Sequence, residues 1–428
     1  MKWRMRYLTM FASALLLVTL SFVLWTSNQK KILRIGVYAG SSWDVPNSRE
    51  NRVLDNIIRQ FEKSHPNVKV IYESGIPKKD YDNWLAEKIL KGEQPDVFMV
   101  PENDFSMLAA SGAFISLDSL ISKEEAAAYY PVAYQAGQYQ GHSYALPIES
   151  NPIMMCVNKD LLEKEGISIP NSNWTLEDLY AICQKVTKDT NGDGLIDQYG
   201  ITDYTWKQAL VAYNGHLRNQ SGVNVDSVEM HQALSFISKL DSLNQRYKVT
   251  SNDFDEGKVA FYPMSLAQYR TYKPYPYHVA KYSRFSWTCI PMPAAKAGIP
   301  ATQVKTSLFA MSSKTKQDKL AWEFMKLLCQ NQKNQQELFA KSQGTSVLTS
   351  VVKSSQTKKI LQADDFGLDS LTSQRLDHMM KHSVLDISRD LDYHSLERLD
   401  YLLGNALKNN EIDSILPSIQ REMEETGK

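Results

Sequence analysis

Residues 189–200, "DTNGDGLIDQYG", place oxygen-bearing side chains at alternate positions of a short loop. Gly194 stands where a sharp turn would let these oxygens converge on one point. A hard cation such as calcium takes six to eight oxygen ligands, and alternate positions of a tight loop can supply them. The spacing therefore predicts a calcium site with four side chains and one backbone carbonyl as its ligands: Asp189, Asn191, Asp193, Leu195 and Asp197.

The loop lacks one part of a complete EF-hand. If Asp189 is position 1, position 12 is Gly200, where an EF-hand has a bidentate Glu. The sequence also has no second matching loop for the pairing that calcium sensors use. We therefore expect a structural calcium rather than a regulatory one. An ion-free cluster of Asx turns is the alternative, and the sequence leaves both open.

Aromatic and polar side chains also meet at the predicted ends of strands. A sugar presents hydroxyl groups and apolar C–H faces, so a sugar site combines flat aromatic rings with carboxylates and amides. The candidates in the first half of the chain are Trp43, Asp44, Glu102, Asn103, Asp104, Glu149, Ser150 and Asn151. Those further along are Tyr204, Trp206, Tyr213, Asn214, Tyr262, Ser265 and Tyr269. We favour Trp43, Glu149 and Trp206 among them.

Three of these candidates could instead serve as catalytic carboxylates. A glycoside-cleaving enzyme would pair two of Glu102, Asp104 and Glu149, but nothing in the sequence shows that two of them face one bond. The sequence has no HExxH, GxSxG or Walker motif. These absences favour a binding protein without catalytic residues. A surface carbohydrate-processing enzyme stays open as the alternative.

The elements that must position these residues form two groups of strands and helices. The apolar runs "ILRIGVYA", "VKVIYE" and "DVFMV" predict strands, and helical periodicity lies between them. This alternation is typical of a parallel sheet. The pattern begins again near residue 150, where "YALPIE" and "PIMMCVN" predict two strands separated at Pro152. From Lys316 onward the pattern predicts helices, so the fold class is α/β with two lobes and a helical C-terminal portion.

The composition fits an ordinary globular protein. The chain has 428 residues, of which 43% are hydrophobic and 22% charged, enough for two or three domains. Lys and Arg together number 48, as do Asp and Glu. Because a nucleic-acid binder usually has a basic excess, we expect no nucleic-acid partner.

The N-terminal segment predicts export. Three basic residues in the first six positions precede the uncharged stretch from Tyr7 to Trp25. At about 1.5 Å per residue this stretch would span most of a ~30 Å hydrocarbon core. The basic residues should stay inside the cell, so the rest of the chain would be exported. The segment is either a cleaved signal peptide or an uncleaved membrane anchor, and the lack of a clear cleavage site favours the anchor.

The four cysteines are scattered and have no metal-binding spacing. Disulfides are possible in an exported chain. Each cysteine also lies in an apolar run, however, where Cys commonly acts as a small buried hydrophobe. We therefore expect free thiols at Cys156, Cys183, Cys289 and Cys329.

Seven blocks of the exported chain occur in the order and spacing of a known family. They are "IIRQFEKSHPNVKVIYE", "EKILKGEQPDVFMV", "AASGAFISLDSLI", "GHSYALPIESNPIMMCVNKDLLEKEGI", "NWTLEDLYAICQKVTKDTNGDGLIDQYGI", "FDEGKVAFYPMS" and "KLAWEFMKLL". They resemble the extracellular solute-binding proteins of ABC importers, specifically the carbohydrate-binding group related to maltose-binding protein. The resemblance implies a bilobed periplasmic-binding-protein-like fold with a hinge. It divides the chain into a signal peptide or anchor with its linker (1–31), a first lobe (32–148 with 290–312) and a second lobe (149–289 with 313–428).

The resemblance also implies a function. A sugar or oligosaccharide would bind in the cleft between the lobes, and the closed form would be presented to the permease subunits and ATPase of an importer. The protein would be a monomer on the extracellular face of the cytoplasmic membrane, anchored or secreted. It would require no cofactor, with a structural calcium as the one candidate ion. A ligand-loaded partner of a membrane sensor is a further possibility.

Overall fold

The computed structural model describes residues 30–43, 45, 50–101, 103–219, 221–245, 247–272, 285–364, 370–409 and 411–426. Two candidate ligand residues, Asp44 and Glu102, lie outside these ranges, and so does the apolar segment from Tyr7 to Trp25. Within the part of the chain that is described, no helix has the length and apolar character needed to cross a membrane.

Three parallel strands begin the main sheet, as the alternating pattern predicts. β1 (Lys31–Gly36) lies between β2 (Val68–Tyr72) and β3 (Val97–Val100). The connecting helices are α2 (Glu50–Ser64) and α3 (Lys78–Leu90). All four residues of β3 are buried, which accounts for its wholly apolar sequence. The predicted α/β class is confirmed.

One long strand, β6 (Ala145–Asn158), runs through both halves of the sheet. Its residues 145–152 pair with β12 (Thr302–Met311), and residues 153–157 pair with β10 (Val259–Ser265). The strand order is β2-β1-β3-β12-β6-β10-β7, with β7 at Tyr199–Ile201. The prediction of two strands separated at Pro152 was wrong. Pro152 lies where β6 changes its neighbour, so its missing N–H interrupts little of either ladder.

Shorter elements connect these strands. The remaining strands are β4 (Gln138–Tyr139), β5 (His142–Ser143), β8 (Arg218–Asn219), β9 (Gly222–Val223), β11 (Trp287–Ile290), β13 (Thr345–Ser346) and β14 (Ser383–Leu385). The helices before β11 also include α4 (Phe105–Ala110), α5 (Lys123–Ala127), α6 (Pro131–Ala136), α7 (Lys159–Lys164), α8 (Leu176–Val186), α9 (Trp206–Ala212), α10 (Val228–Leu243), α11 (Ser251–Asp255) and α12 (Leu266–Tyr272). Thr175 caps α8, because its hydroxyl accepts a hydrogen bond from the Asp178 N–H.

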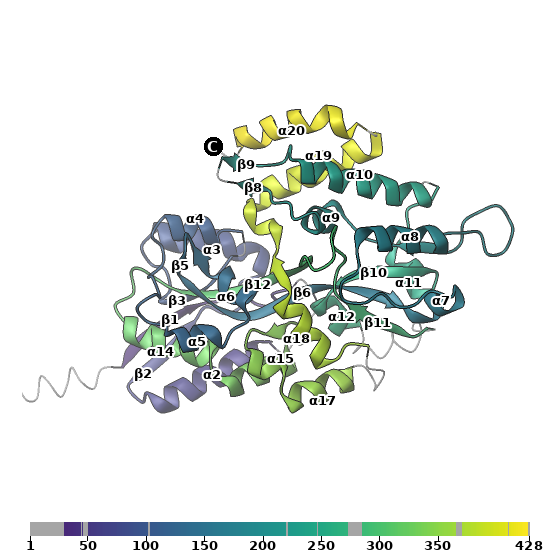
Figure 1. Cartoon of the computed structure of the whole chain (residues 1–428). Coiled ribbons are helices and arrows are strands. Elements are labelled where there is room, and N and C mark those ends of the chain that lie inside the picture. Colours follow the sequence, from purple (N-terminus) through teal and green to yellow (C-terminus); the bar gives the residue numbers. More distant parts are fainter. Residues whose placement is uncertain are drawn as a thin grey trace, which may run out of the picture.

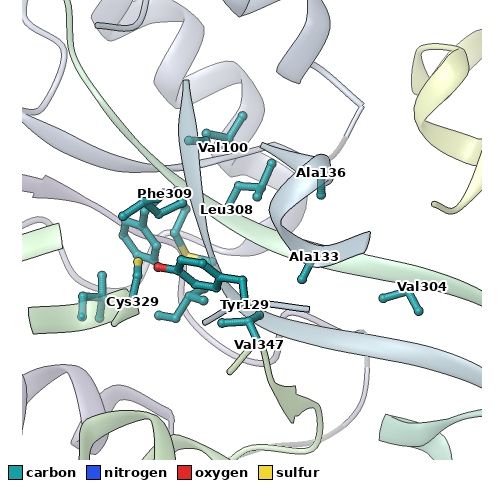
Figure 2. Close-up of a cluster of buried hydrophobic side chains, with 14 of the residues drawn as sticks. Val100, Tyr129, Ala133, Ala136, Val304, Leu308, Phe309, Cys329 and Val347 are labelled. Carbon is teal, nitrogen blue, oxygen red and sulfur yellow. The ribbon is translucent and has the colours of Figure 1, made fainter. Parts of the chain in front are cut away.

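Two buried cores lie on the two faces of β6. Successive strand residues point to opposite faces, so Met154 and Cys156 belong to the first core, and Met155 and Val157 belong to the second. The second core packs α8, α9 and α10 against the sheet. Figure 2 shows part of the first core, including Val100, Tyr129, Ala133, Ala136, Val304, Leu308, Phe309, Cys329 and Val347.

The C-terminal helices divide between the two cores. The first core takes α14 (Asp318–Cys329), α15 (Gln332–Lys341), α16 (Thr349–Val352), α17 (Ser355–Asp364) and α18 (Ser373–Lys381). The second takes the 3-10 helix η1 (Ile387–Asp390), α19 (Tyr393–Asn409) and α20 (Ile412–Thr426). Figure 1 shows α14, α15 and α17 on the side of α2, and α19 and α20 beside α10.

This packing differs from the expected assignment of residues 313–428 to the second lobe. The Phe324 ring of α14 meets the Phe61 ring of α2 edge-on, with 5.3 Å between their centroids. Helical periodicity identifies the apolar face of α14, but it does not identify the element that covers that face. The sequence therefore could not assign these helices to a core.

Candidate functional site

The candidate site lies at the carboxyl ends of β1 and β3. Trp43 follows β1 and is 9% exposed, while Asn103 and Asp104 follow β3 and are half-buried. A small cavity of about 80 Å³ lies among the same elements, and its lining includes Tyr38, Met99 and Glu149. Ligands of open α/β sheets bind at this edge, where the sequence predicts these candidates.

Glu149 is fully enclosed on β6. Its carboxylate accepts a hydrogen bond from the Gly344 N–H (2.7 Å) and another from the Ser342 hydroxyl. A Cβ at Gly344 would collide with the Glu149 carboxylate oxygen, so any larger residue at this position would displace that carboxylate. Burial raises the pKa of Glu149 above its ordinary value, while the bonds from Ser342 and Gly344 and the nearby Arg270 act in the opposite direction. Glu149 therefore holds the loop 342–344 in place, and its contact with a ligand stays a prediction.

The indole N–H of Trp43 is a buried hydrogen-bond donor. Its buried Nε1 has no hydrogen-bond partner of good geometry among the described residues. The indole is still close enough to Glu149 to lower the pKa of that carboxyl. Its own backbone N–H donates to the Ser41 hydroxyl (3.1 Å), which fixes the turn after β1. A buried N–H without an acceptor is a group that a ligand oxygen could satisfy.

Asp104 lies close to two other carboxylates. Burial raises the pKa of Asp104 to about 6, and repulsion from Asp82 and Asp392 adds to this effect. Asp82 lies on α3, whereas Asp392 precedes α19 and accepts a hydrogen bond from the Ser395 N–H (3.0 Å). Asp104, which follows a strand of the first core, is therefore close enough to Asp392, which leads into a helix of the second core, for the two carboxylates to repel each other.

Sequence reasoning missed the segment 386–392. Here the Arg389 guanidinium lies 5.6 Å from the centroid of the Phe105 ring, and it donates to the Ala136 carbonyl (3.1 Å). The segment leads into α19 of the second core, so these contacts connect it with α4 and α6. Its sequence lies inside a region that periodicity assigned to helices, and no local signal marks it as part of a site.

Four candidates beyond residue 200 keep accessible surface. Tyr213 is half-buried, and Asn214 is exposed with a φ of 60°. Burial raises the pKa of Tyr262 to about 12, although this side chain is still partly accessible. The Ser265 hydroxyl accepts a hydrogen bond from the Gln268 N–H (3.1 Å) at the start of α12. All four could still meet a ligand.

Two further candidates are buried in the shared strand. The Ser150 hydroxyl lies 2.9 Å from the Thr306 hydroxyl of β12. The Asn151 side-chain oxygen accepts a hydrogen bond from the Ala267 N–H (2.9 Å). Both polar groups thus connect β6 with its neighbours in this structure.

Three aromatic candidates are core residues. Trp206, which we favoured, is 5% exposed in the second core, and its Nε1 donates to Asp400 of α19 (2.8 Å). Tyr204 packs edge-on against Phe236, and Tyr269 lies 5.5 Å from the Trp287 ring. These three rings are buried in this structure rather than open to solvent, and their contact with a ligand stays a prediction. The sequence does not show that α19 covers α9.

The loop 189–200 is closed by its own hydrogen bonds. Asp189 accepts from the N–H groups of Gly192 and Gly194, both at 2.7 Å. The Asn191 amide donates to Asp193 (3.1 Å), and Asp197 accepts from the Thr190 N–H (2.8 Å). Leu195 is exposed. Among the described residues no group of three or more His, Cys, Asp and Glu side chains is arranged to hold a metal ion. The geometry thus fits the Asx-turn alternative, and calcium binding stays a prediction.

Comparison with known proteins places this geometry in a family. The family model for bacterial extracellular solute-binding proteins matches residues 56–364. A maltotriose-binding protein from Pyrococcus abyssi is 25% identical over 138 residues, which are 32% of this chain and 30% of that relative. A putative binding protein from Brucella abortus is 24% identical over 292 residues, which are 65% of this chain and 68% of that relative. The chain thus matches less than a third of the maltotriose-binding relative.

Solved structures show the same fold. The sugar-binding protein MalE from Xanthomonas citri has a TM-score of 0.75 at 15% identity, over 92% of this chain and 97% of that one. An ABC substrate-binding protein from Listeria monocytogenes, in complex with cycloalternan, has a TM-score of 0.64 at 19% identity, over 93% and 99%. The predicted bilobed fold is confirmed by this likeness. Because the family model covers most of the chain, this protein belongs to the bacterial extracellular solute-binding protein family.

Proposed function

We propose that this protein is the substrate-binding component of an ABC-type carbohydrate importer. The observation that carries the proposal is the arrangement around β6, whose two faces contribute residues to the two cores. Asp104 follows β3 of the first core, and Asp392, which repels it, leads into α19 of the second core. Periplasmic binding proteins are themselves the standard case of hinge closure around a ligand.

A sugar or oligosaccharide suits the groups that stay available. Tyr262 supplies aromatic surface for C–H faces, and Asn103 and Asp104 supply polar atoms for hydroxyl groups. The buried Trp43 N–H has no hydrogen-bond partner of good geometry among the described residues, and a sugar hydroxyl that reaches it would provide one. The names of the relatives support this class, since one is a maltotriose-binding protein and another was solved with cycloalternan.

Delivery would involve other chains. The closed, sugar-loaded form would dock on two permease subunits whose ATPase drives transport. The family is extracellular, and the segment from Tyr7 to Trp25 would hold the protein at the membrane if it is not cleaved. The same loaded form could serve a membrane sensor, which would use the binding step without transport.

One observation favours a second candidate, a surface carbohydrate-processing enzyme. The pKa of Asp104 is raised to about 6, as in a general acid. Glycoside cleavage needs a second carboxylate on the same bond. Glu149 is committed to Ser342 and Gly344, so it is not free to act as that partner. We therefore favour binding without catalysis.

Incubating the protein with a library of sugars and oligosaccharides separates these functions. A binding protein gives a higher melting temperature with its own ligand, and the ligand is recovered unchanged. An enzyme gives cleaved or rearranged product. The Trp43→Ala variant should lose the shift if the indole contacts the sugar, whereas Trp84→Ala, whose indole stacks on Tyr81 and donates to Glu73, serves as the matched control. A library without any stabilising member would count against carbohydrate binding.

A further inference from the structure

Cys156 and Cys289 face each other inside the protein. Cys156 lies on β6 and Cys289 on β11, and they are register partners in an antiparallel pair. Their Sγ atoms are 3.5 Å apart, and both side chains are 0% exposed. Cys183 and Cys329 are also buried, in the second and the first core respectively.

The hydrogen bonds show which kind of antiparallel pair this is. The Cys289 N–H donates to the Ser370 carbonyl (2.9 Å), on the side away from β6, and the Lys159 N–H donates to the Ser286 carbonyl (2.8 Å). Hydrogen-bonded and non-hydrogen-bonded pairs alternate along such a ladder, so the two cysteines form a non-hydrogen-bonded pair. The Cα atoms of such a pair are about 4.5 Å apart, within the ~4.4–6.8 Å that a disulfide spans.

The sequence favours free thiols and the two sulfurs are not bonded in this structure, but we propose that Cys156 and Cys289 form a disulfide in the exported protein. Small rotations of the two side chains would bring the sulfurs from 3.5 Å to about 2.0 Å without moving the strands. The family is extracellular, and disulfides form and persist outside the reducing cytoplasm. Both observations are independent of what the protein binds.

The bond forms by thiol–disulfide exchange. The thiolate of one cysteine attacks the disulfide of an extracytoplasmic oxidoreductase, and the second thiolate resolves the mixed disulfide. The Sγ–Sγ bond of this protein forms while the bond of the oxidoreductase breaks. The oxidoreductase receives two electrons and the two thiol protons as a dithiol. Because neither sulfur is accessible after folding, the exchange must accompany folding.

The disulfide would fasten β11 to the strand that the two halves share. The cysteines are 133 positions apart, so the bond would close a long loop. In the chain-entropy model a long closed loop restricts the unfolded chain strongly, so the bond favours the folded state. Cys183 and Cys329 face no other cysteine among the described residues and should stay thiols.

Thiol mapping of the full-length protein exported from its own host tests this proposal. The protein is denatured in N-ethylmaleimide, then reduced, labelled with a second alkylating agent and digested. We expect the first label on Cys183 and Cys329, the second on Cys156 and Cys289, and a reducible cross-linked peptide that contains the latter two. Four cysteines that carry the first label, or a bridge with another partner, would overturn the proposal.

Two double variants, each lacking one pair of cysteines, serve as a matched comparison. The Cys183→Ala/Cys329→Ala protein should retain the cross-linked peptide. A reductant should lower its melting temperature by roughly 5 °C, as loss of a long-loop disulfide implies. The Cys156→Ala/Cys289→Ala protein should show no shift with reductant. If that second variant does not fold, the mapping of the wild-type protein decides alone. Equal sensitivity of both variants to reductant would contradict the proposal.

Discussion

At the scale of residues, the candidate site divides into groups that the protein occupies and groups left for a ligand. Glu149 and Asn151 are bonded within the fold, whereas Asp104 and Tyr262 keep accessible surface. The sequence predicts these residue types at strand ends. It could not predict which polar atoms are already bonded, because the partners of Glu149 lie 193 and 195 positions away.

The pKa of Asp104 leads to a prediction of pH-dependent stability. This pKa is raised from 3.8 to about 6, so between these values the folded protein binds more protons than the unfolded chain. Stability is therefore greatest below the lower value and falls as the pH rises through about 6. A full shift of this size is worth about 3 kcal/mol, and partial exposure reduces it to about 1 kcal/mol.

The Asp104→Asn variant should remove this fall. We expect it to unfold at a higher urea concentration than the wild type at pH 7, by about 1 kcal/mol, and to match it near pH 4. The exposed Asp80→Asn on α3 is the control and should keep the wild-type profile. Parallel profiles for Asp104→Asn and wild type between pH 4 and 7 would show that the pKa of Asp104 is not raised in the folded protein.

At the scale of elements, the contact between α9 and α19 decides the role of Trp206. The Trp206 indole donates to Asp400, which also forms an ion pair with Lys207 (2.6 Å). The sequence shows the apolar face of α9 but gives no sign that a helix nearly 200 positions later covers it. Helices joined by long-range packing are the elements whose partners local patterns cannot predict.

Trp206→Ala should therefore lower the free energy of unfolding and leave ligand affinity nearly unchanged. Truncating a buried Trp costs about 3–5 kcal/mol, and removing only the acceptor with Asp400→Ala should cost about 1 kcal/mol. Urea unfolding measures both free energies, and ligand affinity of the folded variants should be nearly unchanged. A Trp206→Ala protein with full stability but weakened sugar binding would show that Trp206 contacts the ligand.

The loop 189–200 is a second element with a direct test. Its carboxylates accept N–H bonds from the loop itself, so the Asx-turn interpretation predicts equal melting temperatures in calcium and in chelator. The calcium hypothesis predicts stabilisation by mass action, about 2.7 kcal/mol at a hundredfold excess over the dissociation constant. A calcium-dependent shift that disappears in Asp193→Ala would establish the ion site.

At the scale of the whole molecule, the long strand β6 joins the two cores, because its two faces contribute residues to both. The alternation of strands and helices predicts the class, and the ordered blocks predict the bilobed family, both of which are confirmed. The division of the C-terminal helices was not predictable, since α14 to α18 return to the first core and α19 and α20 cover the second. Relative motion of the cores about the shared strands would open and close the candidate site.

Isothermal titration calorimetry with a panel of oligosaccharides that includes maltotriose measures sugar binding by the protein itself. We expect saturable binding of at least one sugar at one site per chain, with a negative heat-capacity change as apolar surface of the cleft is buried. The Trp43→Ala variant, compared under conditions in which it is shown to be folded, should bind that sugar at least tenfold more weakly. The absence of binding heat at several temperatures across the panel, for a protein shown to be folded, would contradict carbohydrate binding between the two cores.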